Sequence, residues 1–416
     1  MKYLKRFADS ILEERLKSAG AVLIEGTKAC GKTETAKQAA KSIAQFDSDP
    51  QIKIRMEIDP KSVLIGEVPR LIDEWQVYPQ IWNFIRHEVD ARKLKGQFIL
   101  TGSATPDSKI KRHSGAGRFS VIKMRTMSMF ERGWSTGEVS LTELMDGKAP
   151  SSKDVKFDIS ELAEKITIGG WPGLIDQNAA TGLQYAIDYV TLIAEADLSR
   201  VSERKRDPNK VLRLMRSLAR NISTEASLAA LSRDTGGNDS ELNDETVSQY
   251  LNELERLMVV DHLPAWNTHI RSSHMLRKSP KRHFADPSLA IGALGLSIDK
   301  LLADLNYFGL LFESLVIHDL RVYADAGGGK VYHYRDSSGT EVDAIVEYAD
   351  GTWGAFEVKL GVGGVEEATS NLKALADKIN TERVKSPVTL TVITGNGFAY
   401  QRPDGINVVP ISTLTI

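Results

Sequence analysis

The stretch that most constrains this chain is G-T-K-A-C-G-K-T, which begins at Gly26 and ends at Thr33. It satisfies every fixed position of the phosphate-binding loop pattern G-x-x-x-x-G-K-[ST]. An apolar run precedes it at 21–24, and 34–46 has a helix-forming composition, so a strand and a helix should flank the loop. In such a loop, backbone N–H groups and the lysine bind phosphates, and the threonine hydroxyl ligates magnesium. The predicted nucleotide and Mg²⁺ site comprises Gly26, Thr27, Lys28, Ala29, Cys30, Gly31, Lys32 and Thr33.

Composition narrows the class of protein. A chain of 416 residues, 42% of them hydrophobic, has room for about two to four packed domains. Lys and Arg (53) nearly cancel Asp and Glu (55), so attraction to nucleic acid must come from local patches. Cys30 is the only cysteine, which fits a reducing compartment, and we expect the cytoplasm. We see no signal peptide and no segment apolar enough to span a membrane.

An acidic pair follows the next buried run. Residues 52–58 alternate between apolar and polar side chains and predict a strand, and then P-R-L-I-D-E-W covers 69–75. A strand that ends in two carboxylates suits magnesium-dependent hydrolysis. Asp73 would hold the metal through its water shell, and Glu74 would polarise the attacking water.

The next predicted strand ends in hydroxyl side chains. A helix is expected over 79–93, and F-I-L-T-G-S leads the following strand into Thr101 and Ser103. Either hydroxyl could sense the terminal phosphate, or the Thr-Gly-Ser sequence could simply end the strand. The sequence leaves both interpretations open, and we take Thr101 as the candidate nucleotide ligand.

A flexible loop, S-G-A-G-R, ends at Arg118. An arginine on such a loop could stabilise the transition state of phosphoryl transfer, within the chain or on a neighbouring subunit of a homo-oligomer. Arg112 and Arg125 are rival candidates.

Taken in order, G-T-K-A-C-G-K-T, P-R-L-I-D-E-W, F-I-L-T-G-S and S-G-A-G-R resemble prokaryotic AAA-type ATPases that carry an uncharacterised C-terminal domain. The resemblance covers nearly the whole chain. It implies ATP as the nucleotide and a five-stranded parallel core in an α/β protein. The residues that it places in catalytic and binding roles are Lys32, Thr33, Asp73, Glu74, Thr101 and Arg118.

The composition turns polar near 149–153, so we expect domains at 1–150, 151–290 and 291–416. In the middle domain, G-G-W-P-G at 169–173 predicts a tight packing turn. Three helices and two wing strands predict a winged helix, at 207–218, 226–233, 244–258, 259–263 and 282–285.

The third of these helices carries acidic residues on its outward side, which would repel DNA. A basic wing could instead contact phosphate, or it could be a solvated loop. Its cations are Arg271, Arg277, Lys278, Lys281 and Arg282.

The last domain is predicted to follow an α-β-β-β-α-β order, with elements at 299–326, 330–334, 341–346, 354–359, 365–379 and 388–394. Asp343 should lie on one strand of a hairpin. Glu357 and Lys359 should lie on the neighbouring strand, where i, i+2 spacing points both to the same face.

These three residues resemble the core of PD-(D/E)xK nucleases. The resemblance implies that Asp343 and Glu357 hold magnesium, that Lys359 orients or activates water, and that the substrate is a nucleic acid. Val342 departs from the pattern, which usually has proline there. Glu313 on the preceding helix could add a carboxylate. The alternative is a half-exposed hairpin with a cross-strand Asp–Lys pair.

The leading functional hypothesis is therefore an ATPase coupled to a nuclease-like domain that acts on nucleic acid. The alternative is a nucleotide-controlled switch, in which the last domain binds nucleic acid or protein without cutting it. The sequence does not decide between them.

Overall fold

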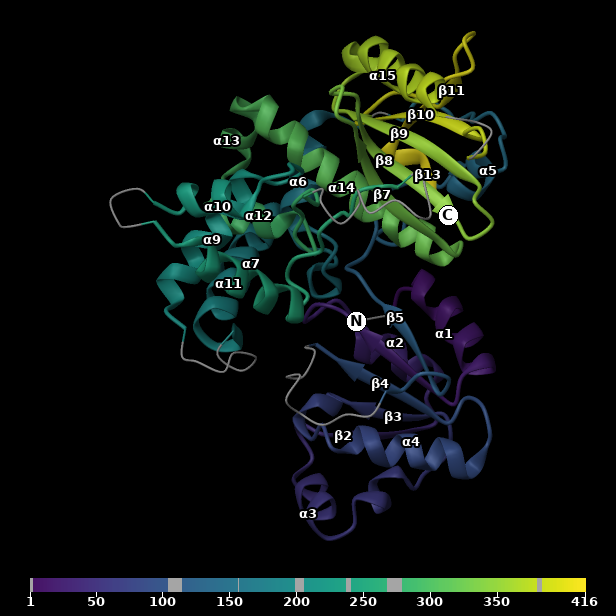
Figure 1. Ribbon diagram of the computed structural model, residues 1–416, viewed down its shortest axis with the longest axis vertical. Coiled ribbons are helices and arrows are strands. Elements are labelled where there is room, and N and C mark those ends of the chain that lie inside the picture. Colours follow the sequence, from purple (N-terminus) through teal and green to yellow (C-terminus); the bar gives the residue numbers. More distant parts are fainter. Residues whose placement is uncertain are drawn as a thin grey trace.

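The computed structural model describes residues 3–103, 114–155, 157–198, 206–236, 241–267, 279–379 and 384–416. The predictions for Arg112, Arg271, Arg277 and Lys278 lie outside these residues. In Figure 1 the first sheet lies at the lower end of the molecule, the helical middle at the left and the C-terminal sheet at the top. Among the described residues, no helix has both the length and the apolar character needed to cross a membrane.

The first domain is built on a parallel sheet of five described strands in the order β2-β3-β4-β1-β5. The strands are β1 (Ala21–Glu25), β2 (Ser42–Gln45), β3 (Arg70–Asp73), β4 (Phe98–Gly102) and β5 (Phe119–Lys123). The apolar runs in β1, β3 and β4 are buried, as strands covered on both faces require. Because all five strands are parallel, their carboxyl ends meet at one edge, where Glu25, Asp73 and Gly102 lie. The five-stranded parallel core is confirmed.

Four helices flank this sheet: α1 (Phe7–Ser18), α2 (Lys32–Ala39), α3 (Pro50–Ile58) and α4 (Ile81–Arg92). The strand predicted at 52–58 is wrong, because this segment is α3. The Asp49 carboxylate caps the helix by accepting from the Gln51 N–H, and Pro50 occupies its first turn. Ile52 and Met56, four residues apart, are the buried pair.

The helix predicted at 34–46 is also shorter than expected. It ends at Ala39, and Ala40 is already extended. The chain then joins the sheet as β2, where the Lys41 N–H donates to the Pro69 carbonyl at 2.8 Å.

The middle of the chain is helical. Its elements are α6 (Ile159–Ile168), α7 (Ala179–Leu192), a π-helical turn (Ile193–Asp197), α9 (Pro208–Arg220), α10 (Leu228–Asp234), α11 (Asp244–Arg256), α12 (Ser288–Leu294) and α13 (Ile298–Ala303). The three helices of the predicted winged helix are thus present as α9, α10 and α11. Within the described part of the predicted wing, the strands are joined by two isolated bridges, Val260 to Phe284 and Leu263 to Lys281. The winged helix therefore stays a prediction.

The basic wing is wrong for the two of its residues that the structure describes. The side chains of Lys281 and Arg282 are buried, so neither is presented to a phosphate backbone. The Arg282 guanidinium donates to the Ala226 carbonyl, and Lys281 lies among carboxylates. Their positive charges compensate partners inside the protein.

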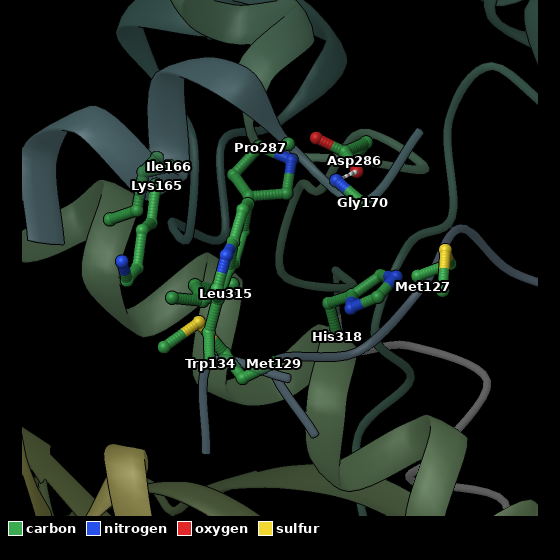
Figure 2. A pocket seen from close by; sticks show the side chains of 11 residues that line it. Met127, Met129, Trp134, Lys165, Ile166, Gly170, Asp286, Pro287, Leu315 and His318 are labelled. Atoms are coloured by element: carbon green, nitrogen blue, oxygen red, sulfur yellow. Dashed lines mark hydrogen bonds between the residues drawn. The ribbon is translucent and has the colours of Figure 1, made fainter. Parts of the chain in front are cut away.

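The turn at 169–173 has the predicted packing role. Trp171 is fully buried, and its indole N–H donates to the Ser288 hydroxyl at 2.9 Å. A Cβ on Gly170 would lie 2.1 Å from the Met127 carbonyl oxygen, so only glycine fits. Figure 2 shows Asp286 and His318 near this turn, with the Gly170 N–H donating to the Asp286 carboxylate. The turn therefore joins the chain after β5 to the middle region and the C-terminal region.

The C-terminal region contains a mixed sheet of six described strands in the order β11-β12-β10-β9-β8-β7. Its elements are α14 (Leu305–Ala326), β7 (Gly329–Arg335), β8 (Glu341–Tyr348), β9 (Trp353–Lys359), α15 (Val365–Lys378), β10 (Thr389–Thr394), β11 (Tyr400–Gln401) and β12 (Asn407–Pro410). The predicted α-β-β-β-α-β order is thus present. The single helix predicted at 299–326 is broken instead at Asp304, whose carboxylate caps α14 by accepting from the Tyr307 N–H.

The residues after β5 turn toward the C-terminal region. Residues after β5 leave the first sheet and form β6 (Val139–Ser140) and α5 (Leu141–Met145). Strand β6 pairs with β13 (Leu414–Thr415) near the end of the chain. Residues 139–145 therefore pack with the C-terminal region, and the domain boundary at 150 stays a prediction.

Candidate nucleotide site and carboxylate cluster

The predicted phosphate-binding loop connects β1 to the N-terminus of α2, as its sequence pattern requires. Two residues adopt the left-handed backbone conformation, Ala29 with φ 60° and Gly31 with φ 103°. A Cβ on Gly26 would lie 2.2 Å from the Met124 carbonyl oxygen, so this position needs glycine. The buried Lys32 ammonium donates to the carbonyls of Gly26 and Thr27 at 2.9 and 2.8 Å. The loop therefore encloses the lysine that would face the phosphates.

Asp73 joins the loop to the neighbouring strand ends. One of its carboxylate oxygens accepts from the Thr33 hydroxyl at 2.8 Å and from the Thr101 hydroxyl at 2.5 Å. These oxygens lie at the N-terminus of α2, and magnesium prefers oxygen ligands of this kind. Thr33 and Asp73 are thus placed together as a shared Mg²⁺ site would need, with Thr101 beside them.

Glu74 lies at the same edge in an unusual backbone conformation, with φ 53°. Its carboxylate accepts from the Gln76 amide and, at 3.3 Å, from the Ser103 hydroxyl. Burial raises the pKa of Glu74, and the nearby Lys32 ammonium opposes that shift. The two hydroxyls considered as phosphate sensors therefore have different partners: Thr101 contacts Asp73, and Ser103 contacts Glu74.

Arg118 lies away from this edge. Its carbonyl accepts from the N–H groups of Gly20 and Ala21, at the start of β1. The phosphate-binding loop follows the other end of β1, roughly 16 Å away for five extended residues. The guanidinium pairs with Asp90 at 2.6 Å. The structure therefore does not bring Arg118 to the loop of its own chain, and its action on a neighbouring subunit stays a prediction.

The rival Arg125 has a different role. Its guanidinium is largely buried and contacts Asp261 at 2.8 Å and also Asp325. Asp261 also binds Lys123 at 2.6 Å and Arg321 at 3.1 Å. Burial alone would raise the pKa of Asp261, but these cations hold it well below its usual range. Arg125 thus ties the first sheet to the rest of the chain.

The loop also contacts the helical middle through residues that the sequence analysis missed. The hydroxyls of Thr27 and Tyr189 share a hydrogen bond of 2.6 Å, and the Lys28 ammonium pairs with Asp197 at 2.5 Å. Burial raises the pKa of Tyr189, which keeps its hydroxyl neutral. Tyr189 lies in the last turn of α7 and Asp197 ends the π-helical turn, more than 160 residues from the loop. No local sequence pattern could have found these pairs.

A cavity of about 180 Å³ lies beside the start of α2. Gly31 and Thr35 line it on the side of the loop, and Leu4, Arg6 and Pro172 line it elsewhere. Arg6 also donates to the Cys30 carbonyl at 3.0 Å, so the N-terminal segment contributes to both the loop and the cavity.

The predicted C-terminal site contains a residue that the sequence analysis had assigned elsewhere. The Lys281 ammonium pairs with Glu313 at 2.8 Å, Asp343 at 3.0 Å and Glu341 at 3.1 Å. Glu357 lies on the neighbouring strand within hydrogen-bonding contact of Asp343. We call Glu313, Glu341, Asp343 and Glu357 the carboxylate cluster.

Charge in this cluster is divided unevenly. Burial and the Asp343 charge raise the pKa of Glu357 to about 10, and burial raises that of Glu313 to about 8. The pKa of Asp343 is lowered: burial opposes this shift, but Lys281 and the Val358 N–H, which donates to its carboxylate at 3.0 Å, stabilise the ionised form. Of the three carboxylates with shifted pKa values, Asp343 is therefore the one that is ionised opposite Lys281.

The expected metal site at Asp343 and Glu357 stays a prediction. Among the described residues, no group of three His, Cys, Asp or Glu side chains could hold a metal ion. Asp343 and Glu357 are in contact, and the ammonium that pairs with Asp343 belongs to Lys281. Lys359 points toward α15, where its ammonium lies 3.4 Å from the Glu367 carboxylate.

Three family models match separate parts of the chain. An AAA domain matches residues 18–132, and two models described as domains of unknown function, DUF8612 and DUF4143, match 159–300 and 308–414. The last match states no activity, so it does not support the nuclease prediction.

Two curated relatives are similar over most of the chain. They are the uncharacterized proteins Mb2031c of Mycobacterium bovis and Rv2008c of Mycobacterium tuberculosis. Each is 26% identical over 361 residues, which cover 85% of this chain and 74% of the relative.

Two solved structures are also similar. The Walker-type ATPase PABY2304 of Pyrococcus abyssi has a TM-score of 0.41 at 12% identity, over 70% of this chain and 96% of that one. A DNA replication initiation factor has a TM-score of 0.23 at 15% identity, over 61% and 89%. At these scores neither likeness defines the fold. Residues 18–132, which contain the phosphate-binding loop, therefore match an AAA domain, and the two later segments match families of unknown function.

Proposed function

We propose that this chain binds and hydrolyses ATP, and that the nucleotide state controls the helical middle. The observation that carries the proposal is Asp73, whose carboxylate accepts from both Thr33 and Thr101 while Glu74 follows it at the same edge. These groups come from three separate segments of the chain. Together they supply a metal ligand, a base and a hydroxyl within reach of one phosphate group.

The residues have distinct tasks in the reaction. Lys32 exchanges the carbonyls of Gly26 and Thr27 for the terminal phosphates, which neutralises their charge. A magnesium ion held by Thr33 and Asp73 would further stabilise the charge on these phosphates. The Glu74 carboxylate orients the attacking water and accepts its proton. Burial favours this role, since a raised pKa makes the carboxylate a stronger proton acceptor.

The nucleoside has a place beside the phosphates. The cavity next to Gly31 and Thr35 begins where α2 starts, so a nucleotide with its phosphates in the loop can extend into it. Leu4 and Pro172 offer apolar surface to a base, and the Arg6 side chain borders the same space.

The contacts between the loop and α7 support control by the nucleotide. Thr27 and Lys28 belong to the loop that must rearrange around phosphate, and their partners Tyr189 and Asp197 lie in the middle region. A nucleotide that binds the loop would therefore compete for Thr27 and Lys28, and so would change the contacts that Tyr189 and Asp197 make. This arrangement favours the nucleotide-controlled switch, with nucleic acid or protein as the partner of the remaining domains.

A nuclease function of the last domain is a second candidate. The observation that favours it is the contact between Asp343 and Glu357 on neighbouring strands. It can be tested by incubating the protein with single- and double-stranded DNA and RNA, with Mg²⁺ or Mn²⁺, with and without ATP. Cleavage by the wild type that is lost in Asp343→Asn would establish this function.

The ATPase proposal is tested with two loop-edge variants and one control. Lys32→Ala should weaken ATP binding by at least tenfold in calorimetry. Glu74→Gln should keep binding and lose at least a hundredfold in turnover, because it removes the base but not the phosphate ligands. Lys37→Ala, in the same helix and paired with Glu34 on the surface, should behave as the wild type. Unchanged ATP affinity in Lys32→Ala would overturn the assignment.

A further inference from the structure

Lys281 is a buried cation that the nucleotide site does not use. Its side chain is 2% exposed. An ammonium group has three donors, and three carboxylates accept from them or pair with it, those of Glu313, Asp343 and Glu341. Each partner comes from a different stretch of the chain than Lys281 itself. The ammonium therefore stands at the point where these carboxylates converge.

The carboxylates are spaced around an ammonium group at hydrogen-bonding distances. The nitrogen to oxygen distances are 2.8, 3.0 and 3.1 Å, the usual range for charged hydrogen bonds. Magnesium would need oxygens at about 2.0–2.1 Å in octahedral geometry, with room for several waters. Carboxylates held apart by an ammonium group cannot close to that geometry while the ammonium remains.

We propose that Lys281 is the resident cation of the carboxylate cluster, and that it takes the place of a divalent metal and closes the cluster to metal. The last domain then binds partners without metal chemistry unless Lys281 leaves. This role holds whether or not the first domain hydrolyses ATP.

The backbone of Lys281 is fixed in a way that supports a permanent role. Its N–H donates to the Leu263 carbonyl and its carbonyl accepts from the Leu263 N–H, both at 3.0 Å. The next residue, Arg282, donates through its backbone N–H to the Thr224 carbonyl at 2.8 Å. Backbone hydrogen bonds to two separate segments, at Leu263 and Thr224, therefore hold Lys281 beside the cluster. If its side chain left before a metal arrived, three carboxylates would face one another without a cation, and this repulsion disfavours departure of the lysine on its own.

The test measures Mn²⁺ binding to the 416-residue chain in the absence of nucleotide. Bound Mn²⁺ is detected as a loss of the electron paramagnetic resonance signal of free Mn²⁺. Wild type should bind no Mn²⁺ in the cluster. Lys281→Met removes the ammonium at similar length and should gain one Mn²⁺ site, at least tenfold tighter than any binding to wild type. Adding Asp343→Asn should abolish the gained site. Lys359→Met, which removes a lysine that faces α15, should gain none.

Two results would overturn the proposal. One is Mn²⁺ binding to wild type that Asp343→Asn removes. The other is a folded Lys281→Met variant that gains no site.

A second measurement covers the case in which Lys281→Met does not fold. Wild-type protein is treated with an acetylating reagent, and modification of Lys281 is read by mass spectrometry with and without millimolar Mn²⁺. Lys281 should stay protected in both samples, whereas the exposed Lys148 should react in both. A Mn²⁺-dependent rise in Lys281 acetylation would mean that metal displaces the lysine, and the proposal would fail.

Discussion

Asp261 is the anion on which the junction between the first sheet and the rest of the chain depends. Its carboxylate binds Lys123, Arg125 and Arg321, at 2.6, 2.8 and 3.1 Å. Lys123 is the last residue of β5, whereas Arg321 lies on α14. A single buried carboxylate thus holds cations from two regions that are nearly 200 residues apart.

Asp261→Asn keeps the shape of the side chain and removes its charge. Removing one partner of a buried ion pair costs about 3–5 kcal/mol, because the other charge is left without compensation. Three features place this case at the lower end. Lys123 is half exposed, Arg125 keeps Asp325, and Arg321 keeps the carbonyls of Asp261 and His262. We expect a loss of about 3 kcal/mol in the free energy of unfolding.

The matched control is Asp325→Asn. Its carboxylate is 40% exposed and binds only Arg125 among the groups of this junction, so its loss should cost less than about 1 kcal/mol. Urea unfolding at pH 7, followed by far-ultraviolet circular dichroism, compares the two variants with wild type. If Asp261→Asn is no less stable than Asp325→Asn, the Asp261 charge does not hold this junction together.

Three further predictions follow from other sites. Gly170→Ala should lower the free energy of unfolding by more than about 2 kcal/mol, because its Cβ would meet the Met127 carbonyl. Gly173→Ala has open space around it and should change that free energy by less than about 0.5 kcal/mol in the same unfolding assay. Burial lowers the pKa of His262 from 6.5 to about 3, so the unfolded chain binds more protons between these values and acid destabilises the folded state. Lowering the pH from 7 to 5 should therefore reduce the free energy of unfolding by about 2 kcal/mol through His262. Urea unfolding of His262→Gln should lack this loss. Equal pH dependence of stability in the wild type and the variant would contradict the argument from burial. Mixing Arg118→Ala with Lys32→Ala protein should restore ATPase activity if Arg118 acts on a neighbouring subunit, and no recovery would argue against that role.

The sequence predicted those parts of the fold in which a local pattern and the packing agree. The loop at 26–33 and the strands β3 and β4 are examples, because long apolar runs and a fixed glycine spacing have few alternative structures. The segment 52–58 shows the limit: its alternation fits a strand, but Ile52 and Met56 also have the spacing of a helix face. The Asp49 cap and Pro50 decide in favour of the helix.

The sites show the same limit at longer range. Thr33, Asp73 and Glu74 could be found because each belongs to a short motif at a strand end. Lys281 could not, since it pairs with carboxylates that lie between 32 and 62 residues away along the chain. Its sequence neighbourhood is basic, which favours a surface wing. Only the fold turns its side chain inward.

A continuous set of contacts runs from the nucleotide loop to the helix that carries Glu313. The Arg6 guanidinium donates to the Cys30 carbonyl in the loop and to the Arg125 carbonyl after β5, both at 3.0 Å. The Arg125 side chain in turn binds Asp261, which binds Arg321 on α14. Phosphate binding that moves the Cys30 carbonyl must therefore break the Arg6 contact or carry Arg6 with it. In the second case the movement reaches α14 through groups that are already paired, which is a physical route by which the proposed nucleotide binding would affect the C-terminal region.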